Sequence, residues 1–138
     1  MEVRELEFIP VIIGGDINAY SIARTFHEEY KVKSLVISKK IKNPWKPTAN
    51  SKIIKNVYVD NLENVDVFKK ILINIAKENK NKKLILFACG DWYVKMLLEI
   101  KNILSKYYII PTIDLKLMDK ITQKDIFYTL CKKLNIDY

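Results

Sequence analysis

The sequence predicts a three-layer α/β fold, a Rossmann-like parallel sheet with helices on both of its faces. Continuous apolar runs, of which FIPVIIGG at 8–15 is the first, are typical of strands that are buried on both sides of a parallel sheet. Segments with helical spacing alternate with these runs, and strand–helix units of this kind imply right-handed crossovers. The length of 138 residues and the apolar content of 49% suit one domain, 1-138, with a sizeable core.

The predicted elements follow one another with few interruptions. The first helix places four apolar residues on one face, at positions i, i+3, i+4 and i+7: Ala19, Ile22, Ala23 and Phe26. The strands are predicted at 8–15, 32–38, 53–60, 84–90 and 107–113. The remaining helices are predicted around 68–76, over 91–106 and from Asp119 through 119-138. A polar segment with two prolines, 39–52, is expected to be a long solvated loop that borders the ligand cleft.

The three glycines of the chain stand where predicted strands end. Gly14 and Gly15 follow the first strand and precede Asp16, and Gly90 follows the fourth strand and precedes Asp91. In open α/β sheets, ligands bind beyond such strand ends, at the point where the strand order reverses. If the first and fourth strands are neighbours, the two turns meet there. The two aspartates then either cap helices or contact a ligand as well, and both alternatives remain open.

The first glycine turn does not match a dinucleotide-binding fingerprint. A G-x-G-x-x-G pattern read from Gly14 requires glycine at position 16, where the chain has Asp16. A carboxylate at this position repels a pyrophosphate and occupies the helix N-terminus that the phosphate needs. No Walker loop is present in the sequence either. The turn therefore favours a ligand with an amine or hydroxyl group over a phosphate.

The net charge of +8 does not indicate a specific nucleic-acid partner. Arg4 and Arg24 are the only arginines among 24 basic residues, and the lysines are spread through every segment. Proteins that read phosphates and bases favour the planar arginine fork. Trp45 between lysines in the loop is the best feature in favour of nucleic acid, but a solvated lysine surface explains the composition better.

Composition gives further expectations about location and chemistry. Cys89 and Cys131 lack metal-ligand spacing and are expected to be buried thiols of a reduced, cytoplasmic protein. No apolar stretch reaches the ~20 residues needed to span a bilayer, so no membrane insertion is expected. His27, on a charged helix segment, is more typical of a surface residue than of a base. We identify no catalytic residue and no metal ligand in this chain.

Four stretches, ordered along nearly the whole chain, carry a family resemblance. They are PVIIGGDINAYSIARTFHEEY, VISKK, LILFACGDWYVKMLLEIKNILSKYYIIP and LMDKITQKDIFYTLCKKLNI. Together they resemble the N-terminal region of ATP-grasp carboxylate–amine ligases, in particular the D-aspartate ligase type, which attaches an amino acid to the peptidoglycan cross-bridge of the cell wall. In that family this region is the pre-ATP-grasp domain, a Rossmann-like layer that precedes the nucleotide-binding lobes.

The resemblance implies an amide-forming reaction and a set of site residues. ATP and Mg²⁺ would activate a carboxylate as an acyl phosphate, which an amine would then attack. The implied substrate-binding residues are Gly14, Gly15, Asp16, Asn18, Arg24 and Asp91, and the implied nucleotide contact is Lys120. The alternative for Arg24, which we prefer, is that it braces the fold, and the alternative for Lys120 is an ordinary surface lysine beside a helix-capping Asp119.

The resemblance also implies that 1-138 is a fragment of a longer ligase and inactive by itself. The magnesium carboxylates and most nucleotide contacts of that family come from later lobes, toward which the helix at 119-138 would lead. A second interpretation is a self-contained α/β domain that binds or senses a small amine or amino acid. A third is a flavodoxin-like regulatory domain, although such domains need an acidic pair where only Asp16 stands. Formation of a homodimer is left open.

Overall fold

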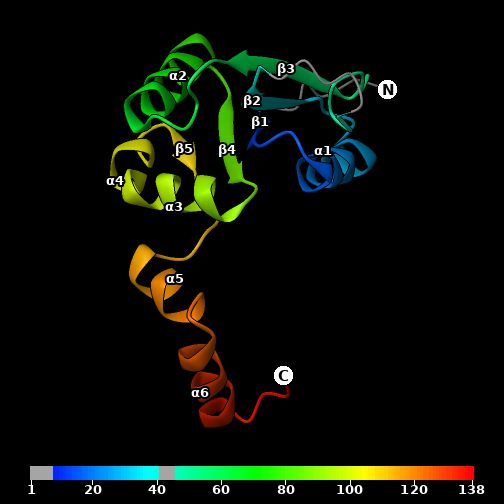
Figure 1. The fold of residues 1–138 in the computed structure, drawn as a ribbon. Helices are drawn as coiled ribbons and strands as arrows, with labels where there is room; N and C mark the ends of the chain where they lie inside the picture. The colour runs from blue at the N-terminus through cyan, green and yellow to red at the C-terminus, as the bar shows by residue number, and fades with distance from the viewer. Residues whose placement is uncertain (1–7, 41–45) are drawn as a thin grey trace.

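The computed structural model describes residues 8–40 and 46–138 and contains one all-parallel sheet of five strands (Figure 1). The strands are β1 (Phe8–Ile13), β2 (Ser34–Lys39), β3 (Ile54–Val59), β4 (Lys83–Ala88) and β5 (Tyr108–Ile109), in the order β3-β2-β1-β4-β5. The helices are α1 (Ile17–Tyr30), α2 (Val65–Glu78), α3 (Asp91–Glu99), α4 (Lys101–Leu104), α5 (Leu115–Ile121) and α6 (Lys124–Leu134). The predicted α/β class is confirmed.

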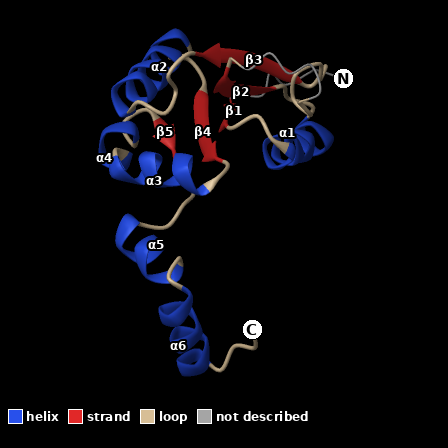
Figure 2. Cartoon of the chain, in the orientation of Figure 1, coloured by secondary structure: helices blue, strands red, loops and turns tan. Residues whose placement is uncertain are grey.

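Helices cover both faces of the sheet (Figure 2). On one face, Ala19 and Ala23 of α1 pack against a cluster that includes Ile12 of β1. On the other face, α2, α3 and α4 bury a larger cluster that includes Val11 and Ile13 of the same strand. Because β1 sends successive side chains into two cores, its sequence is a continuous apolar run rather than an alternating one.

The order of the strands reverses between β1 and β4. From β1 the chain proceeds through α1 to β2 and then to β3 at one edge of the sheet, and α2 carries it back to β4. β1 and β4 pair in parallel over their whole length, from Phe8↔Lys83 to Ile13↔Ala88. The carboxyl ends of β1 and β4 therefore flank the switch point, which is where ligands bind in this class of fold.

Two predicted elements after β4 differ from the structure. The helix predicted over 91–106 is divided into α3 and α4, because Ile100 has φ −112° and ψ 12°, outside the helical range. The strand predicted over 107–113 is limited to two residues, which pair as Leu84↔Tyr108 and Ile85↔Ile109. Pro111 lacks the N–H that would continue the ladder.

The helix predicted over 119-138 begins earlier than expected and is not continuous. The side chain of Asp114 accepts a hydrogen bond of 2.7 Å from a first-turn N–H and so caps α5. Asp119 lies inside α5, so the expectation that it is a cap is wrong. Gln123, with φ −86° and ψ 114°, separates α5 from α6. Figure 1 shows these two helices, the C-terminal arm, extending from the sheet past α3.

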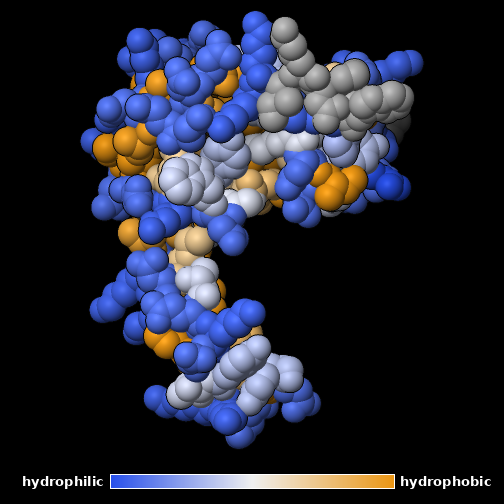
Figure 3. All heavy atoms as spheres, viewed as in Figure 1, coloured by the Kyte–Doolittle hydropathy of each residue, from blue (hydrophilic) through white to orange (hydrophobic). Residues whose placement is uncertain are grey.

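The C-terminal arm leaves apolar side chains in solvent. Of the apolar residues on α6, Cys131 is buried, whereas Phe127 is 40% exposed and Leu134 is 56% exposed. Figure 3 shows hydrophobic residues on the surface of the arm. Both cysteines are buried free thiols, as expected from the sequence. None of the helices in the described ranges combines the length and the apolar character needed to cross a bilayer.

Candidate functional site

The first glycine turn lies directly against the end of β4. Gly14 has φ 126°, and its N–H donates to the Ile37 carbonyl at 2.9 Å. A β-carbon on Gly14 would lie 3.0 Å from Cys89 Cβ and 3.2 Å from Cys89 O, so there is no room for a side chain. The Cys89 N–H in turn donates to the Ile13 carbonyl at 2.8 Å. These contacts place the turns after β1 and β4 side by side.

Asp16 forms the N-cap of α1 and presents a carboxylate at this turn. Its Oδ1 accepts the Ala19 N–H at 3.0 Å, and its Oδ2 accepts the Asn18 side-chain amide at 3.2 Å. An N-cap of this kind contributes about 1 kcal/mol to stability. Each carboxylate oxygen has a further lone pair, so Asp16 can also accept a hydrogen bond from an amine of a ligand.

The neighbouring thiol of Cys89 is not a nucleophile in this environment. Its pKa is raised to about 11, first because the thiol is buried and second because the Asp16 carboxylate is near. A thiol with this pKa is almost entirely neutral at pH 7, and only the thiolate is reactive. The Asp16 charge therefore faces a neutral group on the β4 side.

The second turn differs from expectation in its capping. Gly90, with φ 94°, is the N-cap residue of α3 and makes no side-chain cap. Asp91 is the first residue of the helix, so the expectation that it caps α3 by a side-chain hydrogen bond is wrong. Its exposed carboxylate makes no hydrogen bond or ion pair with a described residue. The negative charge of this carboxylate interacts favourably with the positive N-terminal end of the α3 dipole. Asp16 and Asp91 thus follow neighbouring strand ends, as the sequence predicted.

Three other singled-out residues lie away from this edge. The Arg24 Nε donates to Glu28 Oε1 at 2.7 Å on the exposed side of α1, and this hydrogen bond raises the pKa of Arg24. Arg24 is about 10 Å along the helix axis from the start of α1, at 1.5 Å per residue. Lys120 lies on the exposed surface of α5. His27, expected on the surface, is half-buried, with Nδ1 3.3 Å from the Val32 carbonyl.

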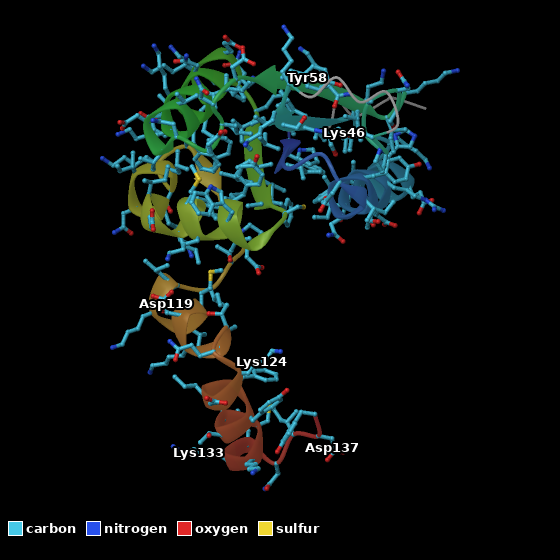
Figure 4. All side chains as sticks on the ribbon, in the orientation of Figure 1. Lys46, Tyr58, Asp119, Lys124, Lys133 and Asp137 are labelled. Carbon is cyan, nitrogen blue, oxygen red and sulfur yellow. The ribbon has the colours of Figure 1, made fainter. Side chains whose placement is uncertain are left out.

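The connection between β2 and β3 supplies residues that sequence reasoning missed. Thr48 Oγ1 donates to the Gly15 carbonyl at 3.3 Å and holds the connection against the glycine turn. A β-carbon on Gly15 would lie 3.0 Å from Lys46 Nζ and 3.4 Å from Ser38 Oγ. Figure 4 marks Lys46 beside this part of the sheet. Trp45, considered above as a nucleic-acid contact, lies outside the described residues.

Two cavities lie near the sheet, and neither is lined by a residue predicted for the site. The larger, about 880 Å³, is at the amino-terminal ends of β1, β2 and β3. The smaller, about 540 Å³, lies between the start of α1 and the β2–β3 connection and is lined in part by Ile17, Tyr20 and Lys46. We take the smaller cavity as the candidate site, because ligands of open α/β sheets bind beyond the carboxyl ends of the strands.

Two observations on the described residues bear on phosphate and metal binding. Asp16 occupies the N-terminus of α1, where a phosphate would otherwise accept hydrogen bonds. Within 8–40 and 46–138, no three histidine, cysteine or acidic side chains are grouped so that they could hold a metal ion. The edge fits a small ligand with an amine or hydroxyl group.

The fold is that of a Rossmann-like α/β domain in which the turns after β1 and β4 lie side by side at the switch point. The chain is 35% identical over 136 residues to a D-aspartate ligase of Enterococcus faecium (strain Aus0004). The match spans 96% of this chain and 31% of the ligase, so the chain corresponds to about a third of that relative's length. The resemblance to D-aspartate ligases is thereby confirmed. No protein-family model matches the chain, and no solved structure matches it significantly.

Proposed function

We propose that this chain is the pre-ATP-grasp domain of an ATP-dependent carboxylate–amine ligase and forms the substrate side of its cleft. The observation that carries the proposal is the pair of acidic turns at the β1–β4 switch point, where Asp16 replaces the bare backbone of a phosphate site. The 35% identity to a D-aspartate ligase supports an amino acid as one of the substrates.

In this proposal the chain binds and orients substrate, and the nucleotide is bound elsewhere in the complete protein. ATP and Mg²⁺ would supply the activation of the carboxylate as an acyl phosphate. The described residues offer no phosphate cradle or metal cluster, so no step of that activation is assigned to them. Asp16 would accept hydrogen bonds from the ammonium group of the substrate, and Asp91 would contribute a second negative charge to the crevice.

The test uses the complete protein that contains this chain. ADP release is measured with ATP, Mg²⁺, D-aspartate and a peptide that carries a primary amine, and each component is omitted in turn. We expect ADP release to require both D-aspartate and the amine. ADP release that depends on neither substrate would overturn the proposal.

Substitution of Asp16 separates binding from capping. Asn is as good an N-cap as Asp, so Asp16→Asn should keep α1 stable while it removes the charge. We expect kcat/KM for D-aspartate to fall about tenfold or more, as expected for loss of a charge-assisted hydrogen bond. Asp66→Asn, at an exposed carboxylate in the first turn of α2, is the control and should leave kcat/KM unchanged.

The nucleotide contact proposed for Lys120 can be tested in the same assay. Lys120 and Lys116 are both exposed on α5, so they form a matched pair. We expect Lys120→Ala to raise the KM for ATP and Lys116→Ala to leave it unchanged. Equal effects of the two substitutions would assign Lys120 to the ordinary lysine surface. For the isolated chain 1-138 we expect no micromolar affinity for ATP by calorimetry.

A further inference from the structure

Two polar side chains lie close against Gly15, at the position where a side chain of this residue would begin. A β-carbon built at Gly15 would lie 3.0 Å from Lys46 Nζ, 3.1 Å from Ser38 Cβ and 3.4 Å from Ser38 Oγ. The ammonium of Lys46 and the hydroxyl of Ser38 are therefore both within 3.4 Å of one point beside the glycine turn. The cavity of about 540 Å³ that Lys46 lines opens next to them.

Hydrogen bonds to the backbone fix the segment that carries Lys46. Thr48, which is fully buried, donates from Oγ1 to the Gly15 carbonyl at 3.3 Å. The side-chain amide of Asn56 on β3 donates to the Thr48 carbonyl at 2.8 Å and to the Ala49 carbonyl at 3.4 Å. These contacts, from the turn after β1 and from β3, hold the backbone just beyond Lys46 against the glycine turn.

Neither polar group at this point has a partner within the described part of the chain. Ser38 is 2% exposed, and its Oγ makes no hydrogen bond. Buried hydroxyl groups without a hydrogen bond are uncommon in folded proteins and call for an explanation. Lys46 Nζ has no carboxylate within 4.0 Å among residues 8–40 and 46–138, although Asp16 stands one residue beyond Gly15.

We propose that Lys46 and Ser38 bind a carboxylate of the amino-acid substrate, while Asp16 accepts its ammonium group. An ammonium and a hydroxyl that meet at one point are complementary to a carboxylate, since both donate hydrogen bonds to it. The carboxylate of Asp16 supplies the opposite charge on the other side of Gly15. The turn therefore complements a zwitterion. The identity of the amino acid, D-aspartate, rests on the proposed function.

The charge of Asp16 favours a carboxylate over a phosphate as the anion at this point. An ATP phosphate carries more negative charge than a carboxylate and would lie near the Asp16 side chain, which already uses the α1 N-terminus through the Ala19 N–H. A zwitterion instead brings a positive group to Asp16. D-aspartate has two carboxylates. In this proposal Lys46 and Ser38 hold one of them in place, and the other is the carboxylate that is activated.

The experiment measures the binding of three probes to the complete protein by calorimetry: D-aspartate, succinate and inorganic phosphate. Succinate has the two carboxylates of D-aspartate but lacks the amine. We expect Lys46→Ala to weaken both D-aspartate and succinate about tenfold or more. Asp16→Asn should weaken D-aspartate and leave succinate unchanged or tighter. Lys70→Ala, at an exposed lysine on α2 that does not line this cavity, is the control and should change neither affinity.

The outcomes separate this proposal from the proposed function. Binding of D-aspartate that depends on Lys46, in a protein without D-aspartate-dependent ADP release, would support the site and refute the ligase activity. Unchanged D-aspartate affinity in Lys46→Ala, or no binding of D-aspartate at all, would overturn the proposal. Phosphate that binds more tightly than D-aspartate and is lost in Lys46→Ala would overturn it in favour of a phosphate site. Lys46→Arg keeps the positive charge and should therefore keep most of the affinity for D-aspartate. If Lys46 had only a structural role, the affinity would not depend on the charge at this position.

Discussion

Replacement of Ser38 by alanine is expected to stabilise the folded protein and to weaken its binding of D-aspartate. Ser38 is 2% exposed, and its hydroxyl has no hydrogen-bond partner among residues 8–40 and 46–138. A buried, unsatisfied polar group costs about 1–3 kcal/mol relative to its hydrated state. Alanine removes that cost and leaves a void smaller than a methyl group. We expect the free energy of unfolding to rise by about 1 kcal/mol.

The assay is urea unfolding of Ser38→Ala and the parent protein, with the slope m compared to establish that only stability has changed. Ser34→Ala is the matched control. Ser34 is 1% exposed on the same strand, and its Oγ also lacks a partner in the part of the chain that the structure describes, but it lies at the opposite end of β2 from the glycine turn. Both substitutions should therefore stabilise the protein, and only Ser38→Ala should weaken D-aspartate.

The reasoning would be refuted if Ser38→Ala lowered the free energy of unfolding by 1 kcal/mol or more. Such a loss would mean that the hydroxyl makes a stabilising hydrogen bond in the unliganded protein, and the point beside Gly15 would then not be set up for a ligand. Equal loss of D-aspartate affinity in Ser34→Ala would refute the assignment to this end of β2 as well.

Three further predictions concern the two turns. Asp16→Ala should lower the free energy of unfolding by about 1 kcal/mol in urea, because the cap to the Ala19 N–H is lost, and Asp16→Asn should not. Gly14→Ala should lower the free energy of unfolding by roughly 2–4 kcal/mol and reduce Tm, because φ is 126° and the new methyl group would overlap Cys89. A Tm within 2 °C of the parent, which corresponds to roughly 0.5 kcal/mol or less, would contradict this prediction. Alkylation of Cys89 in the native protein should have a midpoint near pH 11 instead of 9.0. The same raised pKa means that the free energy of unfolding falls as pH rises from 9 to 11, because over this range the Cys89 thiol is protonated in the folded state and deprotonated in the unfolded state. Equal alkylation rates of the folded and unfolded protein at pH 8 would contradict the raised pKa.

The layers of the fold could be predicted because burial leaves periodic marks in the sequence. The small residues Ala19 and Ala23 at helical spacing indicated a helix that packs closely on a sheet, and they are fully buried in α1. The breaks at Ile100 and Gln123 could not be predicted, because neither residue is a glycine or proline. Ile100 packs against the main core, and that distant contact is not visible in local spacing.

The candidate site could be predicted in part, for a reason of geometry. Parallel strands that are neighbours end at one edge, so glycine turns after β1 and β4 were expected to meet, as the contact between Gly14 and Cys89 shows. The contribution of Lys46 could not be predicted, because it depends on the hydrogen bond from Thr48 to Gly15, 33 residues apart. In a sequence with 24 basic residues, nothing in the local sequence distinguishes Lys46 from the other lysines.

The two glycines of the first turn are glycines for different structural reasons, and the difference is relevant to function. Gly14 is required by the backbone, because its φ of 126° and the nearby Cys89 exclude a side chain. Gly15 has no positive φ, so its backbone would accept another residue. A β-carbon at Gly15 would lie 3.0 Å from Lys46 Nζ and 3.1 Å from Ser38 Cβ, so a side chain there would have to displace one of them. Gly15 is therefore required by its neighbours and not by its backbone, and a larger residue at this position would disturb the two polar groups of the proposed carboxylate site.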